Sequence, residues 1–365
     1  MSFFAADALW VQAERLRQAV ADVFEVDDVT VGGDRAPTIR LRGRLRVASD
    51  QAYALIYERF RTLGFTPLLR RDPRGEVIIA APGTIPTTAP GRGWVPALLL
   101  ALTLASVVYI GAAMDPLPDG RLSLLNGLPF AVSLISILGA HELGHYFAAR
   151  RLGTPVTLPY FIPMPMPPFG TMGAFIQMKA PTRDRRALLK IAIAGPLTGL
   201  VVAVPVLLLG LILSRVEPLP PGGYIMEGNS ILYAALKIIR FGRFLPADGL
   251  DVILHPVAFA GWAGLLVTGL NLIPAGQLDG GHVAYALLGA YARYLTAAII
   301  AILIGLGFLW NGWWLWAFLV FLFNRTQAAP LDDITQLTGL QRAVAVGMLI
   351  LFVLVFTPVP LTVHF

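Results

Sequence analysis

Hydrophobic and polar positions follow two different patterns along the chain. Up to residue 82 they alternate at short range, which predicts a small N-terminal α/β soluble domain over residues 1–82. Residues 83–93 are rich in Pro, Gly and Thr and predict a linker. The elements expected in the domain are a helix over 6–23, a strand over 38–47, a helix over 49–63 and a hairpin of strands 65–71 and 75–81.

Long apolar runs replace this pattern from Trp94 onward. Most of them approach the roughly 20 residues that a helix needs to cross a bilayer. We therefore predict a polytopic all-α membrane protein with about 6–8 transmembrane helices. It divides into a core over 94–290 and C-terminal helices over 291–365. The expected spans are 94–113, 128–149, 188–214, 252–273, 294–309, 311–324 and 342–358.

Composition supports the assignment to a membrane protein. Only 14% of the 365 residues are charged, whereas about 25% is usual in soluble proteins. The chain has no cysteine, which excludes disulfides, thiolate metal ligands and cysteine nucleophiles. Its net charge of +6 does not indicate a nucleic-acid partner, because basic residues beside membrane spans account for it.

The distribution of basic residues predicts the orientation in the membrane. Arg92 precedes the first span, Arg150 and Arg151 end the second, and further Lys and Arg residues follow between 179 and 190. The loop after the first span is mainly acidic. The positive-inside rule therefore places the N-terminal domain in the cytoplasm. We expect a multi-pass protein of the bacterial cell (inner) membrane.

Two segments outside the spans have patterns of their own. Residues 154–180 are apolar but hold six prolines, which predicts a re-entrant or surface-lying segment rather than a helix. Within them, residues 170–178 predict an edge strand that could bind an unwound peptide through main-chain hydrogen bonds, with a plain surface loop as the alternative. Residues 229–241 are amphipathic and predict either a helix on the membrane surface or a short buried helix.

The second span contains the sequence HELGH at residues 141–145, among apolar and small residues. Positions i and i+4 project from one face of a helix, so His141 and His145 can bind one metal ion, and Glu142 can reach a water on that ion. The alternative is a pair of core histidines with Glu142 as their counter-ion. Ionisable groups are costly at membrane depth without a function, which favours the metal site.

A catalytic zinc site usually has three protein ligands. In the absence of cysteine, the candidates for the third are His255, Asp279 and His282. Asp279 comes directly after the fourth span, where Pro274 and Gly276 predict a break in the helix. We therefore expect Asp279 as the ligand, with His282 as the runner-up and His255 at the membrane interface.

The two motifs together resemble those of the site-2 protease family of intramembrane zinc metalloproteases. That family pairs HExxH in one core span with N-x-x-P-x-x-x-L-D-G in a later one, and this chain has HELGH at 141–145 and NLIPAGQLDG at 271–280. The resemblance covers residues 94–290. A soluble domain before the first span and the lack of a PDZ-like insert resemble the branch found in plant plastids and bacteria.

The resemblance implies a role for each matching residue. One Zn²⁺ per chain would be bound by His141, His145 and Asp279. Glu142 would be the general base, and Asn271 would lie near the ligands or the oxyanion. The resemblance also implies a membrane-embedded hairpin within residues 154–180. Its candidate substrate-binding residues are Gly170, Gly173 and Phe175.

We therefore expect a zinc-dependent intramembrane endopeptidase that cuts transmembrane segments of membrane-anchored proteins. Its partners would be those transmembrane substrates and membrane lipid, and the sequence assigns no oligomeric state. Two other classes stay open, a metal-ion transporter or channel lined by the same residues and a catalytically silent binder of membrane segments. Transport needs polar residues at several depths, and the other spans are almost free of them.

Overall fold

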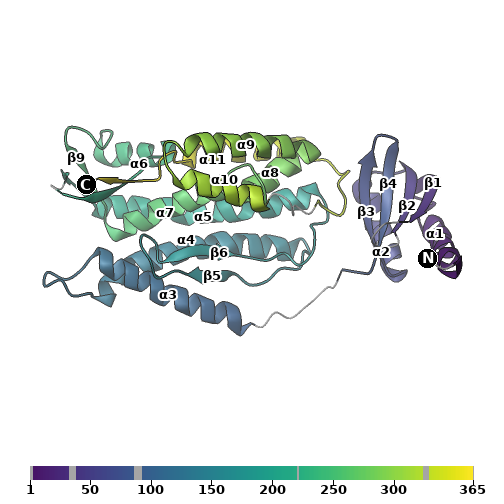
Figure 1. Cartoon of the computed structure of the whole chain (residues 1–365), viewed down its shortest axis with the longest axis horizontal. Helices are drawn as coiled ribbons and strands as arrows, with labels where there is room; N and C mark the ends of the chain where they lie inside the picture. Colours follow the sequence, from purple (N-terminus) through teal and green to yellow (C-terminus); the bar gives the residue numbers. More distant parts are fainter. Residues whose placement is uncertain (1–2, 33–37, 86–92, 220–221, 324–328, 365) are drawn as a thin grey trace. The chain divides into compact units, whose positions relative to one another are not determined.

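The computed structural model describes residues 3–32, 38–85, 93–219, 222–323 and 329–364 (Figure 1). Residues 86–92, which make up most of the predicted linker, lie outside these described residues. Contacts within the chain divide it into two compact units. The first unit comprises Met1–Ala89, Ala180–Leu188 and Ala328–Thr338, and the second comprises Pro90–Lys179, Leu189–Gln327 and Gly339–Phe365.

A four-stranded antiparallel sheet with the strand order β1-β2-β4-β3 forms the centre of the first unit. The predicted helices, strand and hairpin agree with α1, α2, β2 and the pair β3 and β4. Strand β1 was not predicted, because Glu25, Asp27 and Asp28 interrupt its apolar alternation. The elements are α1 Phe3–Val20, β1 Phe24–Gly32, β2 Thr38–Leu45, α2 Ser49–Thr62, β3 Phe65–Asp72 and β4 Gly75–Pro82.

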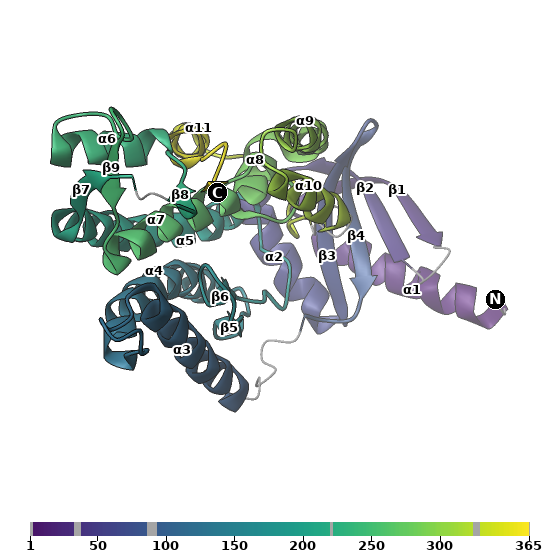
Figure 2. The same ribbon diagram turned by 60° about the vertical axis from the view of Figure 1, so that its left-hand side comes forward.

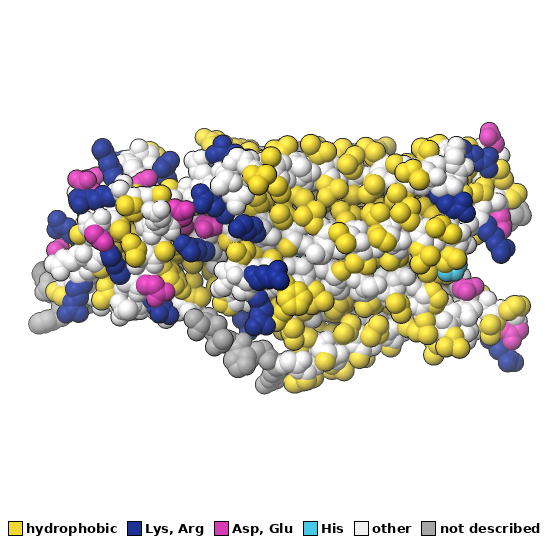
Figure 3. Space-filling view, turned by 180° about the vertical axis from the view of Figure 1, so that it is seen from behind, with side chains coloured by type: hydrophobic (Ala, Val, Ile, Leu, Met, Phe, Trp, Pro, Cys, Tyr) yellow, Lys and Arg dark blue, Asp and Glu magenta, His cyan; other side chains and the backbone are white. Residues whose placement is uncertain are grey.

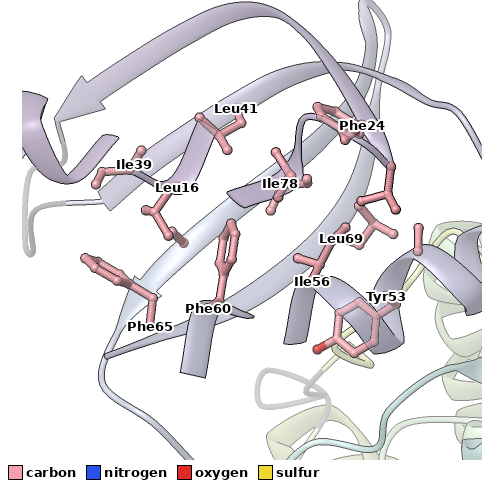
Figure 4. Close-up of a cluster of buried hydrophobic side chains, with 14 of the residues drawn as sticks. Leu16, Phe24, Ile39, Leu41, Tyr53, Ile56, Phe60, Phe65, Leu69 and Ile78 are labelled. Atoms are coloured by element: carbon pink, nitrogen blue, oxygen red, sulfur yellow. The ribbon is translucent and has the colours of Figure 1, made fainter. Parts of the chain in front are cut away.

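Apolar side chains from the two helices pack against one face of this sheet (Figure 4). Leu16 of α1 and Phe60 of α2 belong to the same buried cluster as Ile39, Leu41 and Ile78 of the sheet, and none of the five is exposed. The alternation of β2 places Ile39 and Leu41 in this core. The burial of such side chains stabilises the unit by about 1.5–3 kcal/mol each.

Two segments from later in the chain complete the first unit. The Leu69 N–H of β3 donates to the Leu331 carbonyl at 2.8 Å, and the Asp333 N–H donates to the Leu69 carbonyl at 3.1 Å. The Leu331 N–H in turn donates to the Thr182 carbonyl at 2.9 Å. Residues 331–333 therefore lie between the edge of β3 and residues 182–184, and Leu331 is buried in the core.

Ion pairs hold the same two segments. Arg185 donates to the Asp333 carboxylate at 2.8 Å, and Arg186 donates to the carboxylate of Asp50, at the start of α2, at 3.0 Å. The Ser49 and Thr335 hydroxyl oxygens lie 2.7 Å apart. The first unit thus combines the N-terminal domain with chain segments that the sequence pattern did not connect to it.

The second unit is mostly helical, and among the described residues four helical stretches that lie wholly or mainly in it are long and apolar enough to cross a membrane. They are α3 Trp94–Met114, α4 Leu124–Arg151, α5 Arg185–Leu213 and the stretch Asp279–Leu306, which joins α8 Asp279–Leu288, η1 Gly289–Tyr291 and α9 Ala292–Leu306. Three shorter apolar helices are α7 Pro256–Asn271, α10 Gly312–Phe323 and α11 Gly339–Val355. A total of about 6–8 spans stays a prediction.

Apolar side chains dominate the middle of the helical unit in Figure 3, and charged side chains gather toward its ends. Such a broad apolar surface is typical of a protein that lies in lipid. Inside the unit, α4 packs against both α3 and α7. Helix α4 carries HELGH, so this packing places the motif between neighbouring helices.

Small two-stranded sheets correct the expectation of an all-α membrane part. One of the sheets, β5 with β6, coincides with the predicted edge strand. Strand β9 also replaces the first residues of the span expected over 252–273, and α7 begins only at Pro256. Four-residue strands are too short to show a period of two in the sequence. The pairs are β5 Tyr160–Pro163 with β6 Thr171–Phe175, β7 Arg215–Pro218 with β9 Leu250–Ile253, and β8 Tyr224–Glu227 with β10 Leu361–His364.

The amphipathic segment forms helix α6 Ile231–Phe241. The Ser230 hydroxyl caps its start by accepting from the Tyr233 N–H, and Gly242 ends it with a φ of 72°. One side of the helix is buried, at Tyr233, Leu236 and Lys237, and the other is exposed, with Ile239 at 75%. A helix on the membrane surface and a short buried helix therefore both stay predictions for this segment.

Candidate metal centre

The HELGH motif lies within α4, where His141, Glu142 and His145 are all buried. The helical spacing puts the two imidazoles on one face, with their ring centroids 4.9 Å apart. Their Nε2 atoms lie 3.2 Å from each other. The sequence-predicted pair is therefore assembled by the local helix alone.

A main-chain carbonyl of the neighbouring helix orients His145. Its Nδ1 lies 2.8 Å from the carbonyl oxygen of Ile191 in α5. A carbonyl oxygen can only accept, so Nδ1 carries the proton and Nε2 presents its lone pair. This arrangement leaves Nε2 of His145 free to bind a metal ion, as a hydrogen bond to the second ring nitrogen does in metal sites generally.

Asp279 reaches the two histidines because the chain turns sharply after α7. Gly276 has a φ of 59°, a left-handed conformation that favours glycine. At Gly280 and Gly281 an added Cβ would overlap with carbonyl groups of residues 272–276, so only glycine allows this close return. Helix α8 then begins at Asp279, whose carboxylate points into the cluster.

Three possible ligand atoms converge in this way. Asp279 Oδ2 lies 3.2 Å from Nε2 of His141 and 3.2 Å from Nε2 of His145. The ligand atoms of a tetrahedral zinc site with bonds of about 2.0–2.1 Å lie roughly 3.3 Å apart. The donor types and their separations therefore fit one zinc ion. Among the described residues, His141, His145 and Asp279 form the one group of His and acidic side chains able to hold a metal in this way.

Glycines let α5 approach the histidines closely. A Cβ added at Gly195 would overlap with the His145 imidazole, and one at Gly199 would lie 3.2 Å from Nδ1 of His141. A Cβ at Gly144 of α4 would overlap with Thr198. The Thr198 hydroxyl donates to the Ala140 carbonyl of α4 at 2.8 Å. The two helices therefore leave no space between them at the site.

The other residues singled out in the sequence lie at different distances from the cluster. Asn271, the last residue of α7, places Nδ2 3.4 Å from Nε2 of His141. His282 follows Asp279 by three residues on α8 but is outside the group of ligand atoms. His255 caps α7 by accepting from the Val257 N–H at 3.2 Å. The structure thus brings Asn271 beside His141, whereas His255 and His282 lie outside the group of possible ligand atoms.

The β5 and β6 hairpin lies beside the motif. Strand β6 packs against α4, and the main chain at Ile176 lies beside the Glu142 carboxylate. Gly170 has a φ of 74° and packs against α3, whereas Gly173, with a φ of 100°, faces open space. Phe175 is half exposed and its ring lies 5.6 Å from that of Tyr160. The hairpin thus brings main-chain groups to the general-base candidate.

An apolar cavity of about 610 Å³ adjoins the motif on another side of α4. It lies between α3, α4 and β5, and Ala140 and Leu143 of the motif region line it together with Gly139. Its walls carry few polar groups. The remaining lining residues are Gly93, Pro96, Ala97, Leu100, Ile135, Ser136, Leu158, Pro159 and Phe161.

Sequence reasoning missed the groups that act through the main chain. The Ile191 carbonyl and the Ile176 N–H have no residue-type signature, because every non-proline residue carries them. Gly195 and Gly199 gave a weak signal, since small residues four apart are common where membrane helices pack closely. Those two positions could have been identified from the sequence as a close helix contact.

Comparisons with known proteins agree with the two motifs. The family model described as Peptidase family M50 matches residues 129–311. The chain is 36% identical to "Probable zinc metalloprotease EGY2, chloroplastic" of Arabidopsis thaliana over 72% of this chain and 47% of that protein. It is 29% identical to the protein of the same name from Oryza sativa subsp. indica, over 88% of this chain and 62% of that protein. It is 32% identical to "Probable zinc metalloprotease EGY1, chloroplastic" of Arabidopsis thaliana, over 64% of this chain and 43% of that protein.

Proposed function

Because this chain belongs to peptidase family M50, we propose that it is a zinc-dependent endopeptidase that cuts peptide bonds within membranes. The chain spans about half the length of the curated relatives it matches. The observation that carries the proposal is the convergence of His141, His145 and Asp279 next to Glu142 among apolar helices. Buried ionisable groups at membrane depth mark functional sites.

His141, His145 and Asp279 would hold the zinc ion, which leaves a fourth position for water. When bound, zinc polarises the scissile carbonyl and lowers the pKa of that water. Glu142 would act as general base and acid, accepting a proton from the attacking water and passing it to the leaving amine. The Ile176 N–H lies beside the Glu142 carboxylate and would help to orient it. Asn271 stands beside His141, where its amide can orient the ligands or the oxyanion.

Strand β6 would bind the substrate as an added strand. The main-chain N–H and C=O groups of a transmembrane helix are paired with each other, so the helix must unwind locally before a peptide bond can be cleaved. An edge strand offers main-chain partners to any unwound sequence. Gly173 and Phe175 of β6 would contact the substrate there, whereas Gly170 is buried against α3 and would not. The cavity lined by Gly139 and Leu143 would take an apolar side chain.

The composition of the first unit bears on which side of the membrane three parts of the chain lie. The N-terminal domain, residues 180–188 and residues 328–338 form one compact unit, which supports a location of all three on the same side of the membrane. These segments include Arg183, Arg185 and Arg186, which by the positive-inside rule places that side in the cytoplasm. The relatives are named as chloroplastic, which does not match the expectation of a bacterial cell membrane. We therefore propose the side of the membrane on which the first unit lies, and we do not propose which membrane it is.

Replacement of Glu142 by Gln tests the proposal. The variant keeps the shape of the side chain but removes the base, so we expect cleavage to fall by about 10²–10⁴-fold while bound zinc is unchanged. Glu217→Gln, on the exposed strand β7, serves as the matched control. Fragments of membrane proteins that accumulate with the wild type and not with Glu142→Gln, detected by mass spectrometry, would identify substrates.

Other results would favour the remaining classes. Equal cleavage by Glu142→Gln and the wild type would refute the peptidase. Zinc uptake into sealed vesicles by both proteins would indicate a transporter. Binding of membrane segments without cleavage by either protein would indicate a silent binder.

A further inference from the structure

Helix α6 exposes three isoleucines and buries a lysine. Ile231, Ile238 and Ile239 are 57%, 44% and 75% exposed, whereas Lys237 is 1% exposed. Ile231, Ile238 and Ile239 are spaced by seven and one residues, which puts them on one side of a helix. A helix that faces water has the reverse arrangement, with apolar residues inward and charges outward.

Specific partners hold Lys237 on the inner side. Its Nζ lies 3.7 Å from Oε1 of Glu227 and 3.9 Å from Oδ1 of Asp251, and it stands 4.7 Å above the ring of Tyr233. The Tyr233 hydroxyl donates to Glu227 at 2.8 Å. Burial of a charge is costly without such partners. The inward direction of Lys237 is therefore fixed by its contacts, and the isoleucines must face outward.

The helix is placed to lie along a membrane surface. Its 11 residues extend about 16 Å at 1.5 Å per residue, too short to cross a bilayer. It contacts α11, and Figure 2 shows α6 from the side where α11 is viewed nearly along its axis. Helix α6 therefore runs across the direction of α11, whose Ile350 and Val353 are exposed apolar residues.

We propose that the outer face of α6 binds the lipid bilayer at the boundary between headgroups and acyl chains. Amphipathic helices that lie in this boundary bury an apolar face by about 5–10 Å. Arg240 and Arg243 are exposed at the end of the helix, where guanidinium groups suit lipid phosphates. This combination of isoleucines with terminal arginines favours lipid over a second copy of the chain. The inference is independent of the proposed peptidase activity.

The absence of cysteine makes a site-directed test straightforward. Ile239→Cys and Arg240→Cys, adjacent positions on the same helix, are each labelled with a fluorophore in the full chain and reconstituted into phosphatidylcholine vesicles. Quenching is measured with brominated lipid and with aqueous iodide. We expect brominated lipid to quench the label at 239 at least about twofold more than the label at 240, and iodide to do the reverse.

Each alternative outcome contradicts the proposal. Stronger quenching of the label at 239 by iodide would show that this face is in water. Protection from both quenchers that disappears when the protein is diluted in lipid would show a contact between two copies, and protection that persists would show that protein covers the face. Ile231→Cys, on the same side of α6, provides a second position if labelling at 239 is incomplete.

Discussion

At the scale of single residues, the metal centre depends on backbone groups as much as on side chains. Its candidate ligands were predictable, because a His pair at i and i+4 next to Glu142 is rare in so apolar a chain. The choice of Asp279 over His282 also followed from the break after α7. The Ile191 carbonyl and the Ile176 N–H were not predictable, since they depend on which segments fold against α4.

Gly195 tests how closely α5 must approach the ligands. In Gly195→Ala the new methyl group would overlap with the His145 imidazole, and overpacking of this kind costs about 1–3 kcal/mol. We expect faster release of zinc to a chelator and lower cleavage. Gly305→Ala on α9, where a Cβ would meet nothing within 4 Å, is the control. Equal zinc release from both variants would contradict this account of the site.

Gly139 tests the cavity beside the motif. An added Cβ would stand 4.0 Å from the Phe161 ring, so the position itself has room. A phenylalanine there would occupy the space between α4 and β5. We expect Gly139→Phe to bind zinc normally but to cleave membrane substrates more slowly, measured as a rise in KM. Gly139→Ala should behave as the wild type. An unchanged KM for Gly139→Phe would show that substrate does not enter the cavity.

At the scale of elements, long and strongly periodic segments were predicted best. The helices expected at 94–113 and 188–214 agree with α3 and α5 within a few residues. The short strands β7, β8 and β9 were missed, because four residues do not establish a period. Strand β10 was missed for a further reason. It pairs with β8 from the far end of the chain, and no local pattern encodes such a partner.

The buried charges behind α6 give a prediction about stability. Lys237→Met removes the cation between Glu227 and Asp251 and leaves two carboxylates buried together. Breaking a buried pair in this way costs about 3–5 kcal/mol. We expect a clear fall in the unfolding temperature of the protein in detergent, whereas Arg240→Met, on the exposed side, should change it little. A small effect of Lys237→Met would mean that these charges are hydrated.

The contact between α2 and residues 328–338 can be tested with a disulfide. The Ser49 and Thr335 oxygens lie 2.7 Å apart, so the double variant Ser49→Cys, Thr335→Cys should form an intramolecular bond on mild oxidation. The pair Thr62→Cys, Thr335→Cys starts from the opposite end of α2 and should keep both thiols free. Titration of free thiols in the unfolded protein separates the two results. Two free thiols in the first variant would contradict the contact.

At the scale of the whole molecule, the division into units differs from the linear plan of the sequence. The pattern predicted a domain that ends at residue 82, whereas the first unit also takes in residues 180–188 and 328–338. Pairing across 261 residues, as between Arg70 and the Leu331 carbonyl, leaves no trace in local periodicity. The composition correctly indicated a membrane protein, because that property sums over all residues.

Deletion of residues 1–89 tests whether stability and zinc binding depend on the N-terminal domain. The truncated chain would lose the core that covers Leu331 and the partner of Arg186, so we expect a lower unfolding temperature. Burial of a leucine alone accounts for about 1.5–3 kcal/mol. Zinc content should persist, because His141, His145 and Asp279 all belong to the second unit. Complete loss of zinc from a folded, truncated protein would contradict this expectation.

The inserted position of residues 331–333 beside β3 also has a consequence for biosynthesis. Strand β3 leaves the ribosome long before Leu331 does, so its edge lacks this partner while most of the membrane helices are being made. Unpaired strand edges invite wrong pairing with other chains. The N-terminal sheet can therefore be completed only after residues 331–333 and the membrane helices before them have been translated, and a chaperone that shields this edge would have to leave at that moment.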